Sequence, residues 1–351
     1  MIGWRDNSNK TGKDVAFYLG RFNPIHIGHM TIIDAMLDHN PEVAIFAIGG
    51  ATGARTFKNP WSFSERSVML NLAITDLKRN RAARGKEGGE NTQIRIIGIP
   101  DYISDHRWKQ DIKARIETIV DENDHVQLFG YAKDSSSYYL GLFPEWSFVE
   151  VGMQIDIDAT TVREKIYKDE FVKPDYSKGD INLVSESVFS FIDAWQNSDE
   201  FNALRKEWKF IQDYKKQFEG LKYKPVFVTV DALFITDDKH VVLIKRKEYP
   251  GLGMLAMPGG FVDPNLTLRQ SLDKIIEKKL KINISGIKHT RMEVIDNPDR
   301  SLRGRTLTNV FVFENFGHEG NDIQRYSIGN LAMYRQQMFE DHFMIIDHLL
   351  Y

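Results

Sequence analysis

Residues 20–29 read Gly-Arg-Phe-Asn-Pro-Ile-His-Ile-Gly-His, and they decide the fold of the first part of this 351-residue chain. The apolar run 15–19 precedes them and a stretch with helical spacing follows, so they form a strand-to-helix turn. Gly20, Pro24 and Gly28 have little or no side-chain bulk, so this turn leaves room for a ligand. His26 and His29 can therefore face one phosphate chain beside the N–H groups of the following helix. We expect the turn to bind phosphates.

Composition indicates a globular chain of about two or three domains. Hydrophobic residues make up 42% and aromatic residues 12%, which suffices for packed cores. The formal net charge of −3 predicts small ligands rather than nucleic acid or a membrane surface. The absence of cysteine excludes disulfides, thiolate zinc sites and cysteine nucleophiles, and it fits a cytoplasmic protein. No signal peptide is evident in residues 1–14, and no apolar run approaches the roughly twenty residues that span a bilayer.

Apolar runs alternate with amphipathic segments of helical length up to about residue 151. The predicted strands are 15–19, 43–48, 94–99, 126–128 and 146–151, and the predicted helices are 27–37, 64–77 and 109–120. This alternation predicts a doubly wound α/β domain with a parallel sheet, whose ligands bind at the carboxyl ends of the strands. The charged, glycine-rich residues 79–93 are predicted to form a surface loop with a solvated basic cluster.

A helical region over residues 183–218 is broken by a helix cap at 197–199, and a strand-rich part follows. The strands predicted in this part are 226–235, 241–244, 254–257 and 308–313. We predict a first domain over residues 1–198, a helical connector over 199–222 and an α+β domain over 223–351.

Four further segments lie just beyond predicted strands, so a parallel sheet would bring them together at one edge. They contain Arg55, Lys58 and Asn59, then Asp105 and Trp108, then Lys133, and finally Thr160, Thr161 and Arg163. Singly, each segment has a structural interpretation: Asn59-Pro60 as a turn, Trp108 as a core aromatic residue, Lys133 as a solvated lysine, and the threonine pair as a helix cap. Their expected convergence favours a binding role.

The decapeptide and these segments resemble the HxGH nucleotidyltransferases, and more narrowly the archaeal-type NMN adenylyltransferases that occur fused to a Nudix domain. The resemblance implies a doubly wound parallel-sheet HxGH nucleotidyltransferase domain followed by an α+β Nudix-like sandwich domain. It implies the reaction of ATP with NMN to NAD⁺ and pyrophosphate, with Mg²⁺ held mostly by the ATP phosphates and in-line attack on the α-phosphorus.

The resemblance also implies roles for individual residues. His26, His29 and Arg163 would be catalytic. The ATP phosphates would lie against Gly20, Arg21, Phe22, Gly28, Thr160 and Thr161. NMN would contact Lys58, Asn59, Trp108, Asp105, Arg55 and Lys133, with Trp108 stacking on nicotinamide and Lys58 or Arg55 at the phosphate. Tyr131 stands where a histidine is expected.

Two other functions stay open from the sequence. One is an HxGH transferase acting on phosphopantetheine or a sugar-alcohol phosphate. The tryptophan segment and the run that begins at Lys133 argue against this function. The other is a nucleotide-sensing regulator, which applies mainly to the second domain. The sequence does not decide between NMN and nicotinate mononucleotide, nor whether the chain forms homo-oligomers.

Residues 257–263, Met-Pro-Gly-Gly-Phe-Val-Asp, resemble the opening of a Nudix domain, and residues 296–306 resemble a later loop of ADP-ribose pyrophosphatases. The Nudix signature, laid from Gly260, requires metal-binding carboxylates where this chain has Leu266, Ile275, Lys278 and Lys279. Hard cations need anionic oxygen ligands, so we expect no metal site and absent or weak ADP-ribose hydrolysis. The alternative that stays open is a truly bifunctional enzyme with active ADP-ribose hydrolysis.

The rest of this second pocket consists of Gly259, Gly260, Arg246, Arg303 and Arg305. These residues could still bind ADP-ribose or an adenine nucleotide, or the domain could only pack. Asp273 and Glu277 lie about 200° around the helix from the replaced ligands, so we expect them to point away, with Glu277 paired to Lys281.

Overall fold

The computed structural model describes residues 12–131, 141–152, 157–174, 177, 181–317 and 323–351, and it forms two compact units. The first unit holds Met1–Thr52 and Lys58–Asn202, and the second holds Gly53–Phe57 and Ala203–Tyr351. The segment that we predicted as a connector contains helix α6 (Asp199–Lys216), which begins in the first unit and continues in the second.

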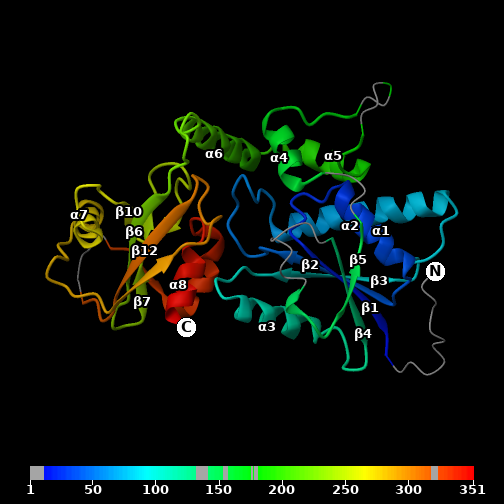
Figure 1. Cartoon of the computed structure of the whole chain (residues 1–351), viewed down its shortest axis with the longest axis horizontal. Coiled ribbons are helices and arrows are strands. Elements are labelled where there is room, and N and C mark those ends of the chain that lie inside the picture. Colours follow the sequence, from blue (N-terminus) through cyan, green and yellow to red (C-terminus); the bar gives the residue numbers. More distant parts are fainter. Residues whose placement is uncertain (1–11, 132–140, 153–156, 175–176, 178–180, 318–322) are drawn as a thin grey trace. The chain divides into compact units, whose positions relative to one another are not determined.

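The first unit is built on a parallel sheet with the strand order β3-β2-β1-β4-β5. The strands are β1 (Asp14–Gly20), β2 (Val43–Gly49), β3 (Gln93–Ile99), β4 (His125–Gly130) and β5 (Ser147–Glu150). Helices α1 (Ile27–Asp38) and α2 (Phe63–Ala83) cover one face and α3 (Asp105–Ile116) covers the other (Figure 1). The doubly wound parallel sheet is therefore confirmed, and the loops after its strands open at one edge.

Burial on both faces explains why β1 and β2 read as continuous apolar runs. Val15, Phe17 and Leu19 of β1 join the core that also contains Ile112 and Ile116 of α3. The rest of the first unit is helical, with α4 (Ala159–Tyr167) and α5 (Glu186–Trp195). The predicted break at 197–199 is confirmed, because α5 ends at Trp195 and the Ser198 hydroxyl caps α6 by accepting from the Phe201 N–H at 3.1 Å.

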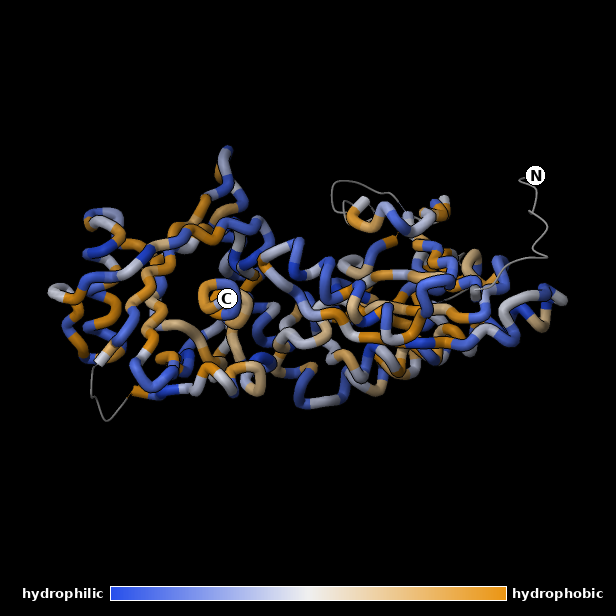
Figure 2. Tube along the Cα trace, turned by 90° about the horizontal axis from the view of Figure 1, so that it is seen from below, coloured by the Kyte–Doolittle hydropathy of each residue, from blue (hydrophilic) through white to orange (hydrophobic). Residues whose placement is uncertain are grey.

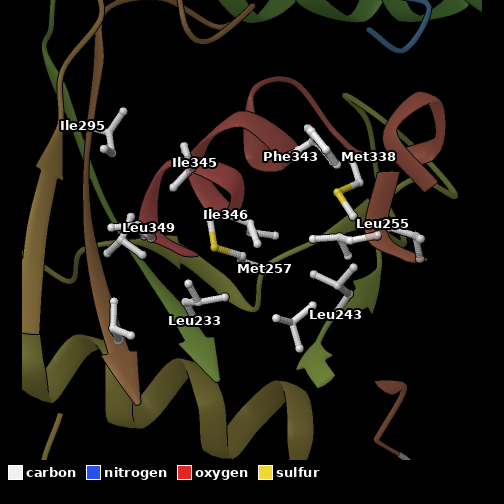
Figure 3. Packing of buried hydrophobic residues seen from close by; sticks show 14 residues of the cluster. Leu233, Leu243, Leu255, Met257, Ile295, Met338, Phe343, Ile345, Ile346 and Leu349 are labelled. Atoms are coloured by element: carbon white, nitrogen blue, oxygen red, sulfur yellow. The ribbon is translucent and has the colours of Figure 1, made fainter. Parts of the chain in front are cut away.

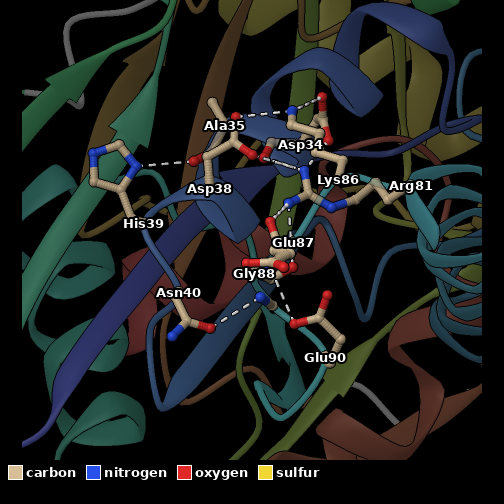
Figure 4. A network of polar contacts seen from close by, with 11 residues as sticks. Asp34, Ala35, Asp38, His39, Asn40, Arg81, Lys86, Glu87, Gly88 and Glu90 are labelled. Carbon is tan, nitrogen blue, oxygen red and sulfur yellow. Dashed lines mark hydrogen bonds and ion pairs between the residues drawn. The ribbon is translucent and has the colours of Figure 1, made fainter. Parts of the chain in front are cut away.

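The prediction of a solvated loop over residues 79–93 was wrong for its first part. Helix α2 continues to Ala83, and Arg81 is only 4% exposed. Its guanidinium binds the carboxylates of Asp34 and Asp38 on α1, and Lys86 binds the same pair at 2.8 and 2.9 Å (Figure 4). Charge pattern alone could not distinguish solvated basic residues from a clamp between two helices.

The second unit is a mixed sheet of order β10-β6-β12-β11 between helices. Its strands are β6 (Phe227–Phe234), β10 (Gly259–Phe261), β11 (Arg291–Ile295) and β12 (Thr306–Phe313), with the short pairs β7 (His240–Val242) to β13 (Arg325–Ser327) and β8 (Ile244–Lys245) to β9 (Leu255–Ala256). Helix α7 (Leu268–Leu280) packs on one face through Leu272 and Ile276. The other face meets the 3₁₀ helix η3 (Ile328–Gln337) and α8 (His342–Leu350) through Ile345 and Ile346 (Figure 3).

This layered α+β arrangement agrees with the predicted Nudix-like sandwich. The sequence analysis did not predict β10, η3 or α8. In Figure 2 apolar and polar stretches alternate along the trace, and among the described residues no helix combines the length and apolar character needed to cross a membrane.

Candidate active site

The turn between β1 and α1 is compact because its glycines admit ring contacts. A Cβ on Gly20 would come within 3.0 Å of the Phe22 ring, and one on Gly28 within 3.1 Å of the His26 ring. Phe22 is buried with a φ of 45°, a left-handed conformation that is uncommon outside glycine. Gly20, Phe22 and Gly28 therefore shape the predicted phosphate turn.

His26 and His29 lie side by side at the start of α1, with ring centroids 3.7 Å apart. The backbone N–H of His26 donates to Nδ1 of His29 at 3.2 Å, which places the proton of a neutral His29 ring on Nε2. Burial and the neighbouring His26 hold the pKa of His29 well below its usual value. His29 is therefore a neutral imidazole with a fixed N–H donor.

Two arginines lie at this turn: Arg21 belongs to it, and Arg163 reaches it from α4. Arg163, on the second turn of α4, donates to the Asn23 carbonyl at 2.6 Å and to the Thr160 hydroxyl at 3.0 Å. Burial lowers the pKa of Arg163, and the positive charge of Arg21 lowers it further. Arg21 pairs with Asp101, which follows β3, at 3.1 Å. The structure thus brings His26, His29, Arg21 and Arg163 together at the carboxyl edge of the sheet.

The two threonines at the start of α4 differ in their contacts. The helix cap that we considered for them is supplied instead by Asp158, whose carboxylate accepts from the Thr161 N–H at 2.8 Å. Thr160 uses its hydroxyl to hold Arg163. Its contact with a phosphate stays a prediction, as does that of Thr161.

The residues predicted to bind NMN do not all lie at the phosphate turn. The Asn59 side chain accepts from the Asn23 amide at 3.0 Å, which joins the segment after β2 to the phosphate turn, and Lys58 is its half-buried neighbour. Trp108 and Asp105 lie on α3, where Trp108 packs against the sheet core near Phe143, with ring centroids 6.4 Å apart. Arg55 groups with the second unit, and Lys133 lies outside the described residues.

Sequence reasoning assigned no role to three residues that the structure places at this edge: Asn23, Asp101 and Arg66. Arg66 is 2% exposed and donates to the carbonyls of Arg21, Gly49 and Gly50. The sequence carries a signal for it, because Arg66 occupies the same helix face as the buried Met69 and Leu70. An arginine on a buried helix face needs acceptors, and here they are backbone carbonyls.

In the second unit, the helix face that replaces the Nudix carboxylates does face the glycine strand. A Cβ on Gly260 would lie 3.4 Å from Ile275, and Lys279 donates to the Gly259 carbonyl. Gly259 itself leaves no room for a side chain, since a Cβ would be 1.9 Å from the Asp231 carboxylate. Lys278 is exposed and Leu266 half-buried.

Asp273, one of the two acidic residues of α7, is bound outside this face. Asp273 accepts from Arg269 at 2.7 Å, and the same guanidinium also binds the carbonyls of Ile284 and Ile287. Glu277 meets Lys281 through the helix backbone, where its carbonyl accepts from the Lys281 N–H at 3.0 Å. Asp273 thus points toward the segment that follows α7, away from β10.

The arginines of the second unit differ in what they contact. Arg246 lies over the Phe339 ring at 3.8 Å and Arg303 over the Phe261 ring at 4.7 Å. Burial and the charge of Arg303 lower the pKa of Arg246. Arg305 instead binds Asp296: its guanidinium donates to the Asp296 backbone carbonyl and pairs with the Asp296 carboxylate.

A buried polar group that the sequence did not reveal lies beside these arginines. Arg300 and Asp341 form a two-pronged pair at 2.9 Å, and Glu340 accepts from the Leu302 N–H at 2.7 Å and the Ser301 hydroxyl at 3.1 Å. Burial raises the pKa of Glu340 to about 7. These contacts fix the loop that carries Arg303.

Known proteins share this geometry and sequence. The cytidylyltransferase-like family model matches residues 17–165. An ADP-ribose pyrophosphatase of Methanocaldococcus jannaschii is 30% identical over 125 residues, which cover 35% of this chain and 72% of that protein.

Two crystal structures of a bifunctional NMN adenylyltransferase/ADP-ribose pyrophosphatase from Francisella tularensis match nearly the whole chain. The first has a TM-score of 0.82 at 28% identity and covers 96% of this chain and 98% of its own. The second, complexed with AMP and a manganese ion, has a TM-score of 0.79 at 29% identity with the same coverage. A nicotinamide/nicotinic acid mononucleotide adenylyltransferase of Acinetobacter baylyi is 31% identical over 199 residues, 56% of this chain and 94% of that protein. The chain therefore belongs to the nicotinamide/nicotinic acid mononucleotide adenylyltransferase family.

Proposed function

We propose that this chain makes NAD⁺ from NMN and ATP with release of pyrophosphate. The observation that carries the proposal is the set of His26, His29, Arg21 and Arg163 at the carboxyl edge of a parallel sheet. Such a set of fixed donors suits a triphosphate, whose charge shifts during the reaction.

The reaction proceeds by in-line displacement at the α-phosphorus of ATP. A 5′-phosphate oxygen of NMN forms the new bond, and the bond to the bridging oxygen of the leaving pyrophosphate breaks. Mg²⁺ accompanies ATP and neutralises charge on its phosphates. The Nε2–H of His29 donates to the reacting phosphate, because its other nitrogen already accepts from the backbone. Arg163 and Arg21 hold the leaving side.

Lys58 and Asn59 are the proposed contacts of the NMN phosphate. Asn59 is tied to the turn by Asn23, so the loops that would hold the two substrates are fixed to each other, which favours the close alignment that proximity catalysis requires. Trp108, with Asp105 nearby, is the proposed platform for the nicotinamide ring.

The test is a product assay on the full chain with ATP and Mg²⁺ and, in turn, NMN, nicotinate mononucleotide and phosphopantetheine. With NMN or nicotinate mononucleotide as the substrate, we expect pyrophosphate and a dinucleotide as products. With phosphopantetheine we expect neither product. Turnover of phosphopantetheine alone would contradict the assignment and favour another HxGH transferase.

For the second unit we propose nucleotide binding without appreciable ADP-ribose hydrolysis. Lys279 lies against the Gly259 carbonyl, where an ammonium group repels a divalent cation. Arg303 and Arg246 supply charge for a diphosphate. A cavity of about 430 Å³ lined by Tyr214, Phe227 and Phe261 among others offers aromatic surface for a base.

This second proposal predicts no metal-dependent release of AMP from ADP-ribose with Mg²⁺ or Mn²⁺. Restoring the carboxylates in one variant, Leu266→Glu, Ile275→Glu, Lys278→Glu and Lys279→Glu, should produce hydrolysis, because positions 275 and 279 face β10 and the variant would supply anionic oxygen ligands there. Glu277→Gln is the matched control and should change nothing. Hydrolysis by the unaltered chain at an ordinary enzymatic rate would overturn the proposal.

A further inference from the structure

Arg66 is a buried cation whose hydrogen bonds all end on backbone carbonyls. Its Nη1 donates to the Gly49 carbonyl at 2.7 Å and to the Arg21 carbonyl at 2.9 Å, and its Nη2 donates to the Gly50 carbonyl at 3.0 Å. A fourth, longer bond runs from Nε to the Ser62 carbonyl at 3.4 Å. One guanidinium thus bridges the loop after β1 and the end of β2.

These carbonyls belong to the residues that shape the phosphate edge. Arg21 begins the turn that carries both histidines, and Gly50 adopts a φ of 61°. A Cβ on Gly50 would lie 3.3 Å from the Arg21 guanidinium and 3.2 Å from the Asp101 carboxylate. The position of Gly50 therefore limits where the Arg21 side chain can lie.

We propose that Arg66 is a positioning residue for adenylyl transfer, which fixes the loops after β1 and β2 so that Arg21 is presented to the ATP phosphates. The proposal rests on the proposed function of the first site. A guanidinium is suited to this task because its planar fork spans several acceptors, whereas an ammonium is a single point.

The charge of Arg66 also acts on its neighbour. The pKa of Arg66 is lowered to about 10, chiefly by burial and further by the positive charge of Arg21. The negative charges of Asp101 and Glu65 act in the opposite direction. The group therefore stays charged at neutral pH and repels the Arg21 guanidinium, whose ion pair with Asp101 is largely exposed. An incoming phosphate chain relieves this repulsion by adding negative charge.

Helix α2 does not depend on Arg66 for its start. Ser62 caps the helix, and the Glu65 carboxylate accepts from the Ser62 N–H at 2.7 Å. A substitution of Arg66 that keeps this capping box should therefore leave the helix in place.

The test compares Arg66→Lys and Arg66→Met in the full chain. We expect kcat/KM for ATP to fall by about 10- to 100-fold in Arg66→Lys and further in Arg66→Met, because small misplacements of binding groups are costly. The KM for NMN should change less than twofold. Activity of Arg66→Lys should also fall in the alkaline range, where a buried lysine loses its proton before arginine does.

Arg81→Lys is the matched control, since Arg81 is a second buried arginine on α2, about 22 Å further along the helix. It should lower the melting temperature and leave the kinetics of ATP unchanged. If both Arg66 variants keep the wild-type kcat/KM for ATP and pH profile, the positioning role is wrong. If the wild type itself makes no dinucleotide, the proposed function fails, and the affinities of wild type and Arg66→Lys for ATP then test Arg66 separately.

Discussion

At the scale of single residues, the chemistry of the first site depends on the protonation of His29. The hydrogen bond from the His26 N–H occupies Nδ1, and the pKa of His29 lies well below its usual value. A neutral ring with its proton on Nε2 can donate to a phosphate oxygen over the whole neutral range. A protonated ring would lose the backbone hydrogen bond that orients it.

His29→Ala should lower turnover by about two to three orders of magnitude, the usual loss for one preorganised donor. The rate of pyrophosphate release from ATP and NMN measures it. His125→Ala is the control, since His125 is exposed at the start of β4, at the opposite end of the strands. A His29→Ala enzyme with nearly wild-type NAD⁺ synthesis would contradict the role assigned to this histidine.

The motif residues could be predicted from sequence because a turn that binds phosphate constrains consecutive positions. Gly20 and Gly28 prove necessary for ring contacts, and His26 and His29 do meet. Arg66 and Asp101 escaped prediction because their roles depend on which segments the sheet brings together. Of the four carbonyls that Arg66 binds, only that of Ser62 is close in sequence, and the other three lie 16 to 45 residues away.

At the scale of elements, α1 and α2 are held together by a charged clamp. Arg81 reaches the carboxylates of Asp34 and Asp38, and it also donates to the carbonyls of Glu87 and Gly88 (Figure 4). The two histidines lie at the start of α1, whereas Asp34 and Asp38 lie in its second half. This clamp therefore stabilises the helix and does not contact the reacting groups.

Arg81→Met should lower the free energy of unfolding by about 2 kcal/mol. Breaking a buried ion pair by removing one partner costs about 3–5 kcal/mol, but here the two carboxylates are partly exposed and keep Lys86 as a partner. Urea unfolding of the variant measures this change. Arg79→Met, at an exposed position of the same helix, should have an effect of less than about 0.5 kcal/mol; an equal loss in both variants would exclude the clamp.

Sequence periodicity was most informative for β1 and β2, which are almost fully buried, and for α1 and α3, which cover the sheet. The runs of β1 and β2 and the amphipathic spacing of α1 and α3 gave the parallel sheet. Strand β10 escaped because two of its three residues are glycines, which have low strand propensity. Its place is set by packing, since Gly259 lies against Asp231 and Gly260 against Ile275.

At the scale of the whole molecule, every titrating group contributes to the way the free energy of unfolding depends on pH. The sign of the contribution of Glu340 follows from its raised pKa. Its pKa is raised from 4.5 to about 7 in the folded chain, so the folded state binds more protons than the unfolded state between these values. Stability from this group is therefore fully present below about pH 4.5, falls as the pH rises and levels off above about pH 7.

Glu340→Gln should remove this loss, because the amide stays neutral and its oxygen can accept from the Leu302 N–H and the Ser301 hydroxyl as the carboxyl does. The variant should match the wild type near pH 4.5 and exceed it by up to about 3 kcal/mol near pH 8. Unfolding curves of both chains at each pH measure the difference, and Glu314→Gln, at an exposed position, controls for the loss of one charge. If Glu340→Gln is less stable than the wild type at pH 8, the attraction of Arg303 outweighs the cost of burying the charge, and Glu340 is an ionised partner of the loop.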